Sequence, residues 1–369
     1  MKKILSLIAA ATFILSACDN NKKEAAAEEK PTVKIGAVLP LSGDSAFAGI
    51  ATRAGLEMIL DREKAKGLKY NYKFIFEDNA GESMRAATST NKLIYSDKVN
   101  ALLSIWHPLS GIMAHIANNN KIVSMSCSWA DEALIGDYSF NAISTHEDTV
   151  ELLIQELKKR NIRKVATLMD PSGEPSLKVM KEKFPQAGIK LVYSEVVNYG
   201  QRDYKMEITK ANARNPEMYI IGGFSPLHFI FTKQLGEITG KKNVTGIDAF
   251  SDMSEKERVL VEGLWYIDSN VNGNEQFAED MLKEKGTPTE SCAGNTAANL
   301  QILIKAFENA PLKAGETVPS SESVVEYIKN NIVNFDTVSG RVTVSEDGLI
   351  DIKPHVRMVK DGKTVEIEE

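Results

Sequence analysis

The residues best suited to binding chemistry lie in LLSIWHPLSGIMAHI, residues 102–116. An apolar, strand-like run stops at Trp106 and His107, and a helical pattern begins at Pro108. Proline suits the first helical position, and this start leaves Leu109–Gly111 with unpaired backbone N–H groups. Together with the helix dipole, such groups favour an anion. The stretch therefore predicts an anion-binding helix N-terminus.

The side chains beside this helix start are unusual for an anion site. Trp106 offers a flat face for stacking or for a cation, and His107 can donate to an anion or titrate. Leu109 and Ser110 belong to the same candidate site. A structural interpretation stays open, in which Trp106 packs into the core and His107 caps the helix.

A second candidate element is SMSCSWADEAL, which follows another strand-like run. Ser128 and Asp131, three residues apart, are typical of a capping box at a helix start. Trp129 adds a second possible aromatic wall, and partial packing on the surface is the alternative.

The N-terminus predicts export and lipidation. Lys2 and Lys3 precede an apolar run of about 14 residues, which suits a signal peptide and is too short for a membrane span. The run ends in LSAC, so we expect residues 1–18 to be a lipoprotein signal peptide with Cys18 as the lipidated residue; an ordinary secretory signal is the alternative. Residues 19–31 carry no bulky apolar residue and predict a flexible tether.

Charge and cysteine content narrow the function classes. The net charge of −6 gives no reason to expect a nucleic-acid partner. No later apolar run is long enough for a transmembrane helix. Cys127 and Cys292 could pair in an oxidising compartment. Because the sequence does not give their distance, we expect two buried free thiols instead.

From Val33 onward, strand-like and helix-like segments alternate, and the rhythm resumes after residue 147. The alternation predicts parallel sheets covered by helices on both faces, in two similar lobes. Ligands bind such sheets at the carboxyl ends of the strands. In the C-terminal third we expect helices near 274–285, 293–309 and 321–331, followed by hairpin strands around EDG and KDG turns.

Three segments carry a family resemblance: VKIGAVLPLSGDSAFAGIATRAGLEM, SMSCSWADEAL and GQRDYKMEITKANARNPEMYIIGG. Their order and spacing resemble the extracytoplasmic binding proteins of branched-chain amino-acid ABC transporters, which have the type I periplasmic binding fold. The resemblance implies an α/β protein with two doubly wound parallel-sheet lobes joined by a three-crossing hinge. Lobe 1 would hold residues 31–144 and 271–337, and lobe 2 residues 145–270 and 338–369.

The resemblance also implies a ligand site. Phe47 aligns with an aromatic residue that lines the cleft, and Phe224 lies likewise in lobe 2. Asp248 aligns with the family's acidic group for a ligand ammonium, and Glu174 lies in a loop where relatives often carry a tyrosine. Ala130 stands where family members often have a threonine whose hydroxyl touches the ligand carboxylate. The hydroxyl set is thus depleted, which argues against an ordinary α-amino acid.

These features imply a binding protein and not an enzyme. We expect a ligand with an apolar or aromatic body and a cationic group, with or without a carboxylate, delivered to an ABC permease in the inner membrane. The protein would lie outside the cytoplasm, lipid-anchored to that membrane. The alternative is a sensor of the same fold that signals to a receptor. We expect no catalytic residue and no cofactor, since the chain has no Gly-x-Ser-x-Gly nucleophile elbow. We expect no metal, since His107 and His115 are too far apart along one helix to chelate one ion.

Overall fold

The computed structural model describes residues 30–129, 133–223, 227–241, 243–251, 253–269, 271–290 and 292–367. The predicted signal peptide with Cys18, most of the predicted tether, and the candidate residues Ala130 and Phe224 lie outside these ranges. Within them, no helix has both the length and the apolar character that crossing a membrane requires.

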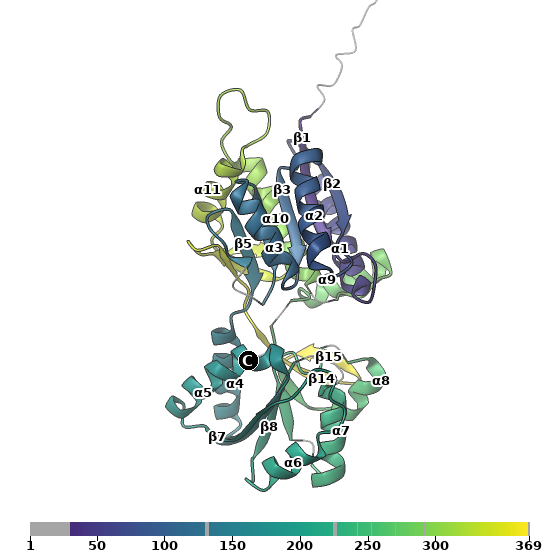
Figure 1. Cartoon of the computed structure of the whole chain (residues 1–369), viewed down its shortest axis with the longest axis vertical. Coiled ribbons are helices and arrows are strands. Elements are labelled where there is room, and N and C mark those ends of the chain that lie inside the picture. The colour runs from purple at the N-terminus through teal and green to yellow at the C-terminus, as the bar shows by residue number, and fades with distance from the viewer. Residues whose placement is uncertain are drawn as a thin grey trace, which may run out of the picture. The chain divides into compact units, whose positions relative to one another are not determined.

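Residues from the first part of the chain and from a later segment build an eight-stranded sheet (Figure 1). Its order is β11-β12-β13-β5-β4-β3-β1-β2, and all neighbouring strands from β13 to β2 are parallel. The strands are β1 (Thr32–Leu39), β2 (Asn71–Asp78), β3 (Ala101–Ile105), β4 (Val123–Cys127), β5 (Ser139–Ile143), β11 (Phe335–Thr337), β12 (Gly340–Val344) and β13 (Leu349–Asp351). The helices that accompany this sheet are α1 (Ala46–Ala65), α2 (Ser83–Lys92), α3 (Leu109–Asn119), α9 (Glu275–Asp280), α10 (Ala293–Asn309) and α11 (Ser321–Asn331).

Helices cover both faces of this sheet, which explains its nearly continuous apolar strands. Side chains alternate between the faces: Leu103 and Ile105 join the core under α1, α10 and α11, whereas Leu102 joins the core under α2 and α3. Residues of β3, β4 and β5 are all buried. The predicted doubly wound arrangement is confirmed for this part of the chain.

The middle of the chain builds a second parallel sheet of four strands, in the order β7-β6-β8-β9. An isolated bridge between Ile247 and Ile267 leads to a three-stranded antiparallel sheet, β10-β14-β15. The strands are β6 (Lys164–Met169), β7 (Lys190–Val196), β8 (Met218–Gly222), β9 (Val244–Gly246), β10 (Trp265–Asp268), β14 (His355–Lys360) and β15 (Lys363–Glu366). The helices here are α4 (His146–Lys159), α5 (Glu174–Gln186), α6 (Lys205–Asn212), α7 (Leu227–Thr239) and α8 (Glu255–Arg258).

The strand pairing corrects the predicted boundary at residue 338. β12 and β13 belong to the eight-stranded sheet, and Ile350 of β13 pairs in parallel with Ala142 of β5. The chain therefore leaves this sheet after Asp351, and only β14 and β15 join the second set of strands. Sequence pattern misses this because β13 is short and finds its partner about 200 residues away.

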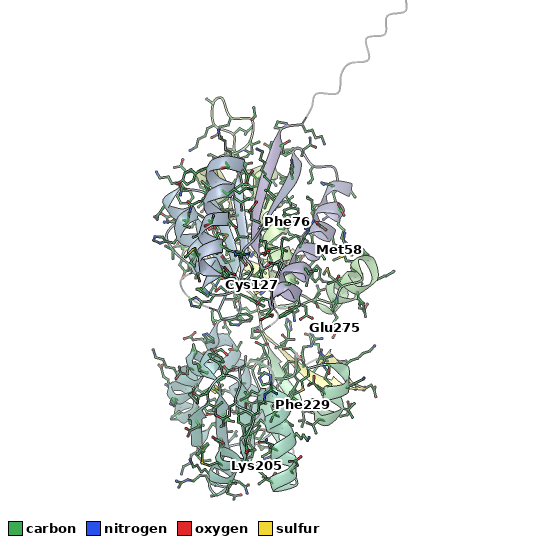
Figure 2. All side chains as sticks on the ribbon, turned by 45° about the vertical axis from the view of Figure 1, so that its right-hand side comes forward. Met58, Phe76, Cys127, Lys205, Phe229 and Glu275 are labelled. Carbon is green, nitrogen blue, oxygen red and sulfur yellow. A yellow bond between two sulfur atoms is a disulfide. The ribbon has the colours of Figure 1, made fainter. Side chains whose placement is uncertain are left out.

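The expectation of two free thiols is wrong. Cys127, at the end of β4, and Cys292, directly before α10, form a disulfide with their Cα atoms 5.8 Å apart. Figure 2 places Cys127 in the part that holds the eight-stranded sheet. Both cysteines are fully buried. The bond ties α10 to the strand end from which the second candidate loop departs.

Candidate functional site

The candidate site begins at the carboxyl edge of the eight-stranded sheet, where β1, β3 and β4 end side by side. Phe47, in the first turn of α1, and Trp106, directly after β3, bring their rings to a centroid distance of 5.9 Å. The Phe47 side chain is 52% exposed, and Trp106 is partly buried against the core. The sequence placed these residues in one site, and the structure brings them together as an accessible aromatic pair.

The helix after Trp106 begins one residue later than predicted, at Leu109. Trp106 has a φ of 65°, a left-handed conformation that tryptophan rarely adopts. Its carbonyl oxygen accepts the Ser110 N–H at 2.8 Å and the Ser110 hydroxyl at 2.6 Å. The predicted free N–H of Ser110 is therefore wrong, because the turn uses that group. His107 is exposed beside this helix start.

The loop after β4 is fixed by a buried amide that the sequence reading missed. The Asn141 side chain accepts the Ser128 N–H at 3.0 Å and donates to the Ser128 carbonyl at 2.7 Å. Ser128 is buried, and Trp129 is partly buried against the same core as Trp106. An asparagine in the buried strand SFNAI is the sequence signal that could have identified this support. The backbone N–H and carbonyl groups of Ser128 are therefore both used to hold the loop in place.

The turn that precedes Phe47 is held by Asp78 at the end of β2. One carboxylate oxygen of Asp78 accepts the N–H groups of Leu41, Ser42 and Ala80 at 2.8, 3.2 and 2.8 Å, and the other accepts the Ser42 hydroxyl at 2.5 Å. Burial opposes ionisation of Asp78, but these hydrogen bonds lower its pKa overall. The carboxylate therefore supports the loop that carries Phe47.

At the carboxyl edge of the four-stranded sheet the side chains are acidic. Glu174 is exposed at the first position of α5, and Asp170 follows β6, with one oxygen accepting the Ser172 N–H at 2.9 Å. Tyr199, after β7, is 64% exposed; burial first, and then the charges of Asp170 and Glu174, raise its pKa. The sequence reading missed Tyr199, although an aromatic residue just beyond a strand end is a usable signal.

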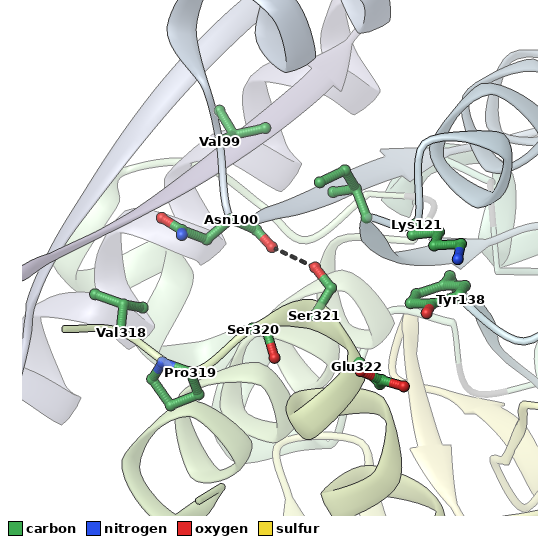
Figure 3. A pocket seen from close by; sticks show the side chains of 10 residues that line it. Val99, Asn100, Lys121, Tyr138, Val318, Pro319, Ser320, Ser321 and Glu322 are labelled. Carbon is green, nitrogen blue, oxygen red and sulfur yellow. Dashed lines mark hydrogen bonds between the residues drawn. The ribbon is translucent and has the colours of Figure 1, made fainter. Parts of the chain in front are cut away.

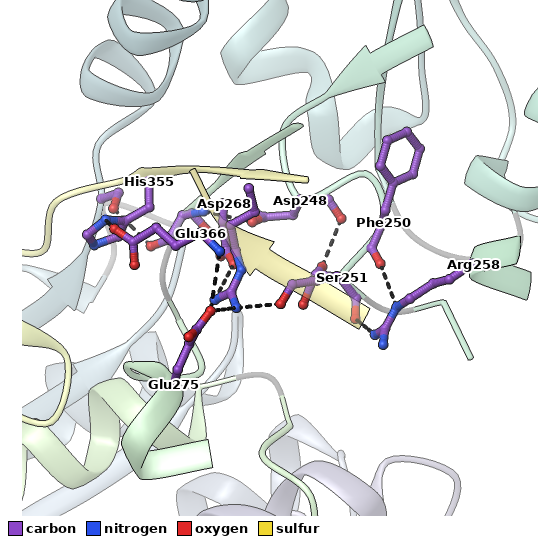
Figure 4. Close-up of polar contacts among 12 residues, drawn as sticks. Asp248, Phe250, Ser251, Arg258, Asp268, Glu275, His355 and Glu366 are labelled. Atoms are coloured by element: carbon purple, nitrogen blue, oxygen red, sulfur yellow. Dashed lines mark hydrogen bonds and ion pairs between the residues drawn. The ribbon is translucent and has the colours of Figure 1, made fainter. Parts of the chain in front are cut away.

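The carboxylate of Asp248, which follows β9, is already hydrogen-bonded within the protein (Figure 4). Its two carboxylate oxygens accept the Ser269 N–H at 2.8 Å and the Ser269 hydroxyl at 2.6 Å. Its own N–H donates to the Ile267 carbonyl at 2.7 Å, and its φ is 53°. Burial, followed by the charge of Asp268, raises the pKa of Asp248 to about 7. The predicted ammonium contact of Asp248 stays a prediction.

A pocket of about 360 Å³ lies at the opposite, amino-terminal edge of the eight-stranded sheet (Figure 3). Its lining includes Asn100, Lys121 and Tyr138, which come just before β3, β4 and β5. Ser321, at the start of α11, donates its hydroxyl to the Asn100 carbonyl at 3.3 Å there. This pocket is separate from the aromatic pair, which lies beyond the carboxyl ends of the strands.

Comparisons with known proteins agree with this arrangement. A family profile described as "Periplasmic binding protein" matches residues 32–360. The chain is 22% identical over 341 residues to the Leu/Ile/Val-binding protein BraC3 of Rhizobium johnstonii, covering 86% of this chain and 88% of that protein. Within the described ranges, no group of three His, Cys, Asp or Glu residues could hold a metal ion.

Solved structures share the fold at low sequence identity. The branched-chain amino acid transporter substrate-binding protein LivJ of Streptococcus pneumoniae, in complex with isoleucine, has a TM-score of 0.73 and 17% identity, over 91% of this chain and 100% of that chain. An ABC transporter solute-binding protein of R. palustris, in complex with benzoate, has a TM-score of 0.74 and 17% identity, over 91% and 95% of the two chains. The type I periplasmic binding fold expected from the sequence is confirmed.

Proposed function

Because the chain belongs to the periplasmic binding protein family, we propose that it is an extracytoplasmic solute-binding lipoprotein that hands a small ligand to an ABC importer. Cys18 would carry the lipid anchor, and the importer's permease in the inner membrane would be the partner. The ligand would be held by residues at the carboxyl ends of both parallel sheets, where open α/β sheets bind their ligands.

The observation that carries the ligand assignment is the accessible Phe47–Trp106 ring pair. A flat aromatic or quaternary ammonium group gains from stacking or cation–π contact with such rings. Ser110 and Ser128 would be expected to bind an amino-acid carboxylate. The Ser110 hydroxyl and the Ser128 N–H, however, already donate hydrogen bonds within the protein. Leu109 and Gly111 are the other N–H donors predicted in the first turn of α3. These features favour an aromatic or cationic body over leucine, isoleucine or valine.

The acidic edge of the four-stranded sheet supports the cationic part of the proposal. Glu174 is an exposed carboxylate there and Tyr199 has an exposed ring, and the charges of both Asp170 and Glu174 act on that ring. A ligand ammonium would be attracted by this set and would gain most where water is excluded. The relative BraC3 is named as a Leu/Ile/Val-binding protein, so a preference for an aromatic or cationic ligand would separate this chain from it.

Calorimetry on the purified mature protein tests the assignment with four ligands: leucine, phenylalanine, benzoate and choline. We expect phenylalanine or choline to bind more tightly than leucine, and Phe47→Ala to weaken that binding by about tenfold, since an aromatic contact is worth roughly 0.5–1.5 kcal/mol beyond the buried area. Tyr95→Ala is the matched control, because Tyr95 is a 62% exposed ring outside the candidate site. Leucine as the tightest ligand, unaffected by Phe47→Ala, would refute the assignment.

A further inference from the structure

Three connections carry the chain between the eight-stranded sheet and the other strands, and each departs from a well-defined strand end. The first is only Ser144 and Thr145, between β5 and α4. The second follows β10 and begins at Ser269, and the third follows β13 and begins at Ile352. These positions are 125 and 208 residues from Ser144 in sequence.

One hydroxyl group joins all three connections. The Ser144 Oγ lies 2.9 Å from the Ser269 carbonyl oxygen and 2.7 Å from the Ile352 carbonyl oxygen. Ser144 is 3% exposed, so water does not replace these contacts easily. Because a hydroxyl has a single proton, the two carbonyl groups share one donor and depend on it together.

The neighbouring residues fix each connection on its own. Thr145 caps α4 by accepting the Asp148 N–H at 3.0 Å, which sets where the first connection ends. Ser269 is held at its N–H and hydroxyl by Asp248, so its carbonyl group is left to face Ser144. Pro354 restricts the third connection. Ser144 is therefore the point at which three separately supported segments become one unit.

We propose that Ser144 is a clamp that makes the three connections move as one body, and that it positions the two halves of the ligand site without touching the ligand. The effect on affinity rests on the proposed function, since it assumes that both halves contact the solute. Without the clamp, each connection moves separately in the ligand-free protein. Ligand binding must then restrict more motion, which costs more conformational entropy. Ser144→Ala should then weaken all ligands by the same factor.

Two variants make the test specific. Ser144→Ala removes the shared hydroxyl group, and Ser144→Thr retains a hydroxyl as the conservative rescue. Ser139→Ala is the matched control: Ser139 is the first residue of β5, the strand that ends directly before Ser144. It is 1% exposed and donates its hydroxyl to the nearby Ile135 carbonyl at 2.9 Å. All three proteins should keep the far-UV circular dichroism spectrum of the wild type.

The first measurement is hydrogen–deuterium exchange on the ligand-free proteins. We expect Ser144→Ala to accelerate exchange in all three connections together, by roughly threefold to tenfold, the range that the loss of one shared hydrogen bond gives. Ser139→Ala should leave the connections unchanged. Faster exchange confined to the first connection would overturn the clamp. Equal acceleration in Ser144→Ala and in the control Ser139→Ala would also overturn it.

The second measurement is calorimetry with each ligand that the wild type binds. A clamp predicts a uniform loss of roughly threefold to tenfold, unchanged ratios between ligands, and recovery in Ser144→Thr. A loss restricted to one ligand would mean that Ser144 contacts that ligand and would refute the clamp. If the wild type binds none of the four solutes, the proposed function fails while the exchange measurement still decides the clamp.

Discussion

Removing the Cys127–Cys292 disulfide should destabilise the protein strongly. The bond closes a loop of 165 residues, for which the chain-entropy relation gives about 5 kcal/mol of stabilisation at 25 °C. The relation overstates the effect where the unfolded chain retains some structure, and removing a native disulfide typically costs about 2–5 kcal/mol. We therefore expect the Cys127→Ala, Cys292→Ala double variant to lose about 3–5 kcal/mol of unfolding free energy.

The assay is urea unfolding followed by tryptophan fluorescence in a Trp265→Phe background. The chain has three tryptophans, so this background leaves Trp106 and Trp129, which both pack against the core of the eight-stranded sheet. Trp265 lies in β10, with the Arg160 guanidinium 4.4 Å above its ring, and would otherwise report on another part of the fold. The wild-type protein with reductant in the urea series should approach the double variant. A loss below about 1 kcal/mol, with or without reductant, would refute the loop-closure reasoning.

Three further outcomes are expected. Asp248→Asn should remove a pH effect on stability, because the folded pKa of Asp248 is raised from 3.8 to about 7. The stability that the protonated carboxyl group contributes is present below about pH 4 and is lost as the pH rises to about 7. The melting temperature of the wild type should therefore fall relative to that of the variant between pH 5 and pH 8. Asn141→Ala should lose about 1–3 kcal/mol in urea unfolding, since two buried backbone groups of Ser128 lose their partners; a variant as stable as the wild type would contradict this. Gly49→Ala should melt at least several degrees lower, because a Cβ atom there would lie 2.0 Å from the Pro40 carbonyl oxygen; an unchanged melting temperature would show that the turn can yield.

Much of the architecture could be predicted from sequence because its signals are local. The helices expected at 293–309 and 321–331 match α10 and α11 to the residue. The KDG turn lies between β14 and β15, as its sequence indicates. Such signals depend on residues a few positions apart, namely apolar periodicity and turn chemistry.

Features that depend on distant residues could not be predicted in the same way. The spacing of Cys127 and Cys292 in sequence gives no distance in space, so the disulfide was missed. The pairing of β13 with β5 and the shared Ser144 hydroxyl also join segments far apart in the chain. Within the site, residue types suggested the Phe47–Trp106 pair, but only the fold shows that the Ser110 N–H is already used.

The position of β13 has a consequence for how the protein is made. β5 pairs with β4 on one side, and its other side is covered only when residues 349–351 arrive. During synthesis from the N-terminus, about 200 residues are added after β5 before its edge is closed, and an open strand edge can pair with other chains. Folding of the eight-stranded sheet also depends on these contacts between distant residues, which makes it slow. We therefore expect truncation before residue 349 to yield aggregated protein, and a chaperone that delays collapse of the nascent chain to improve its yield.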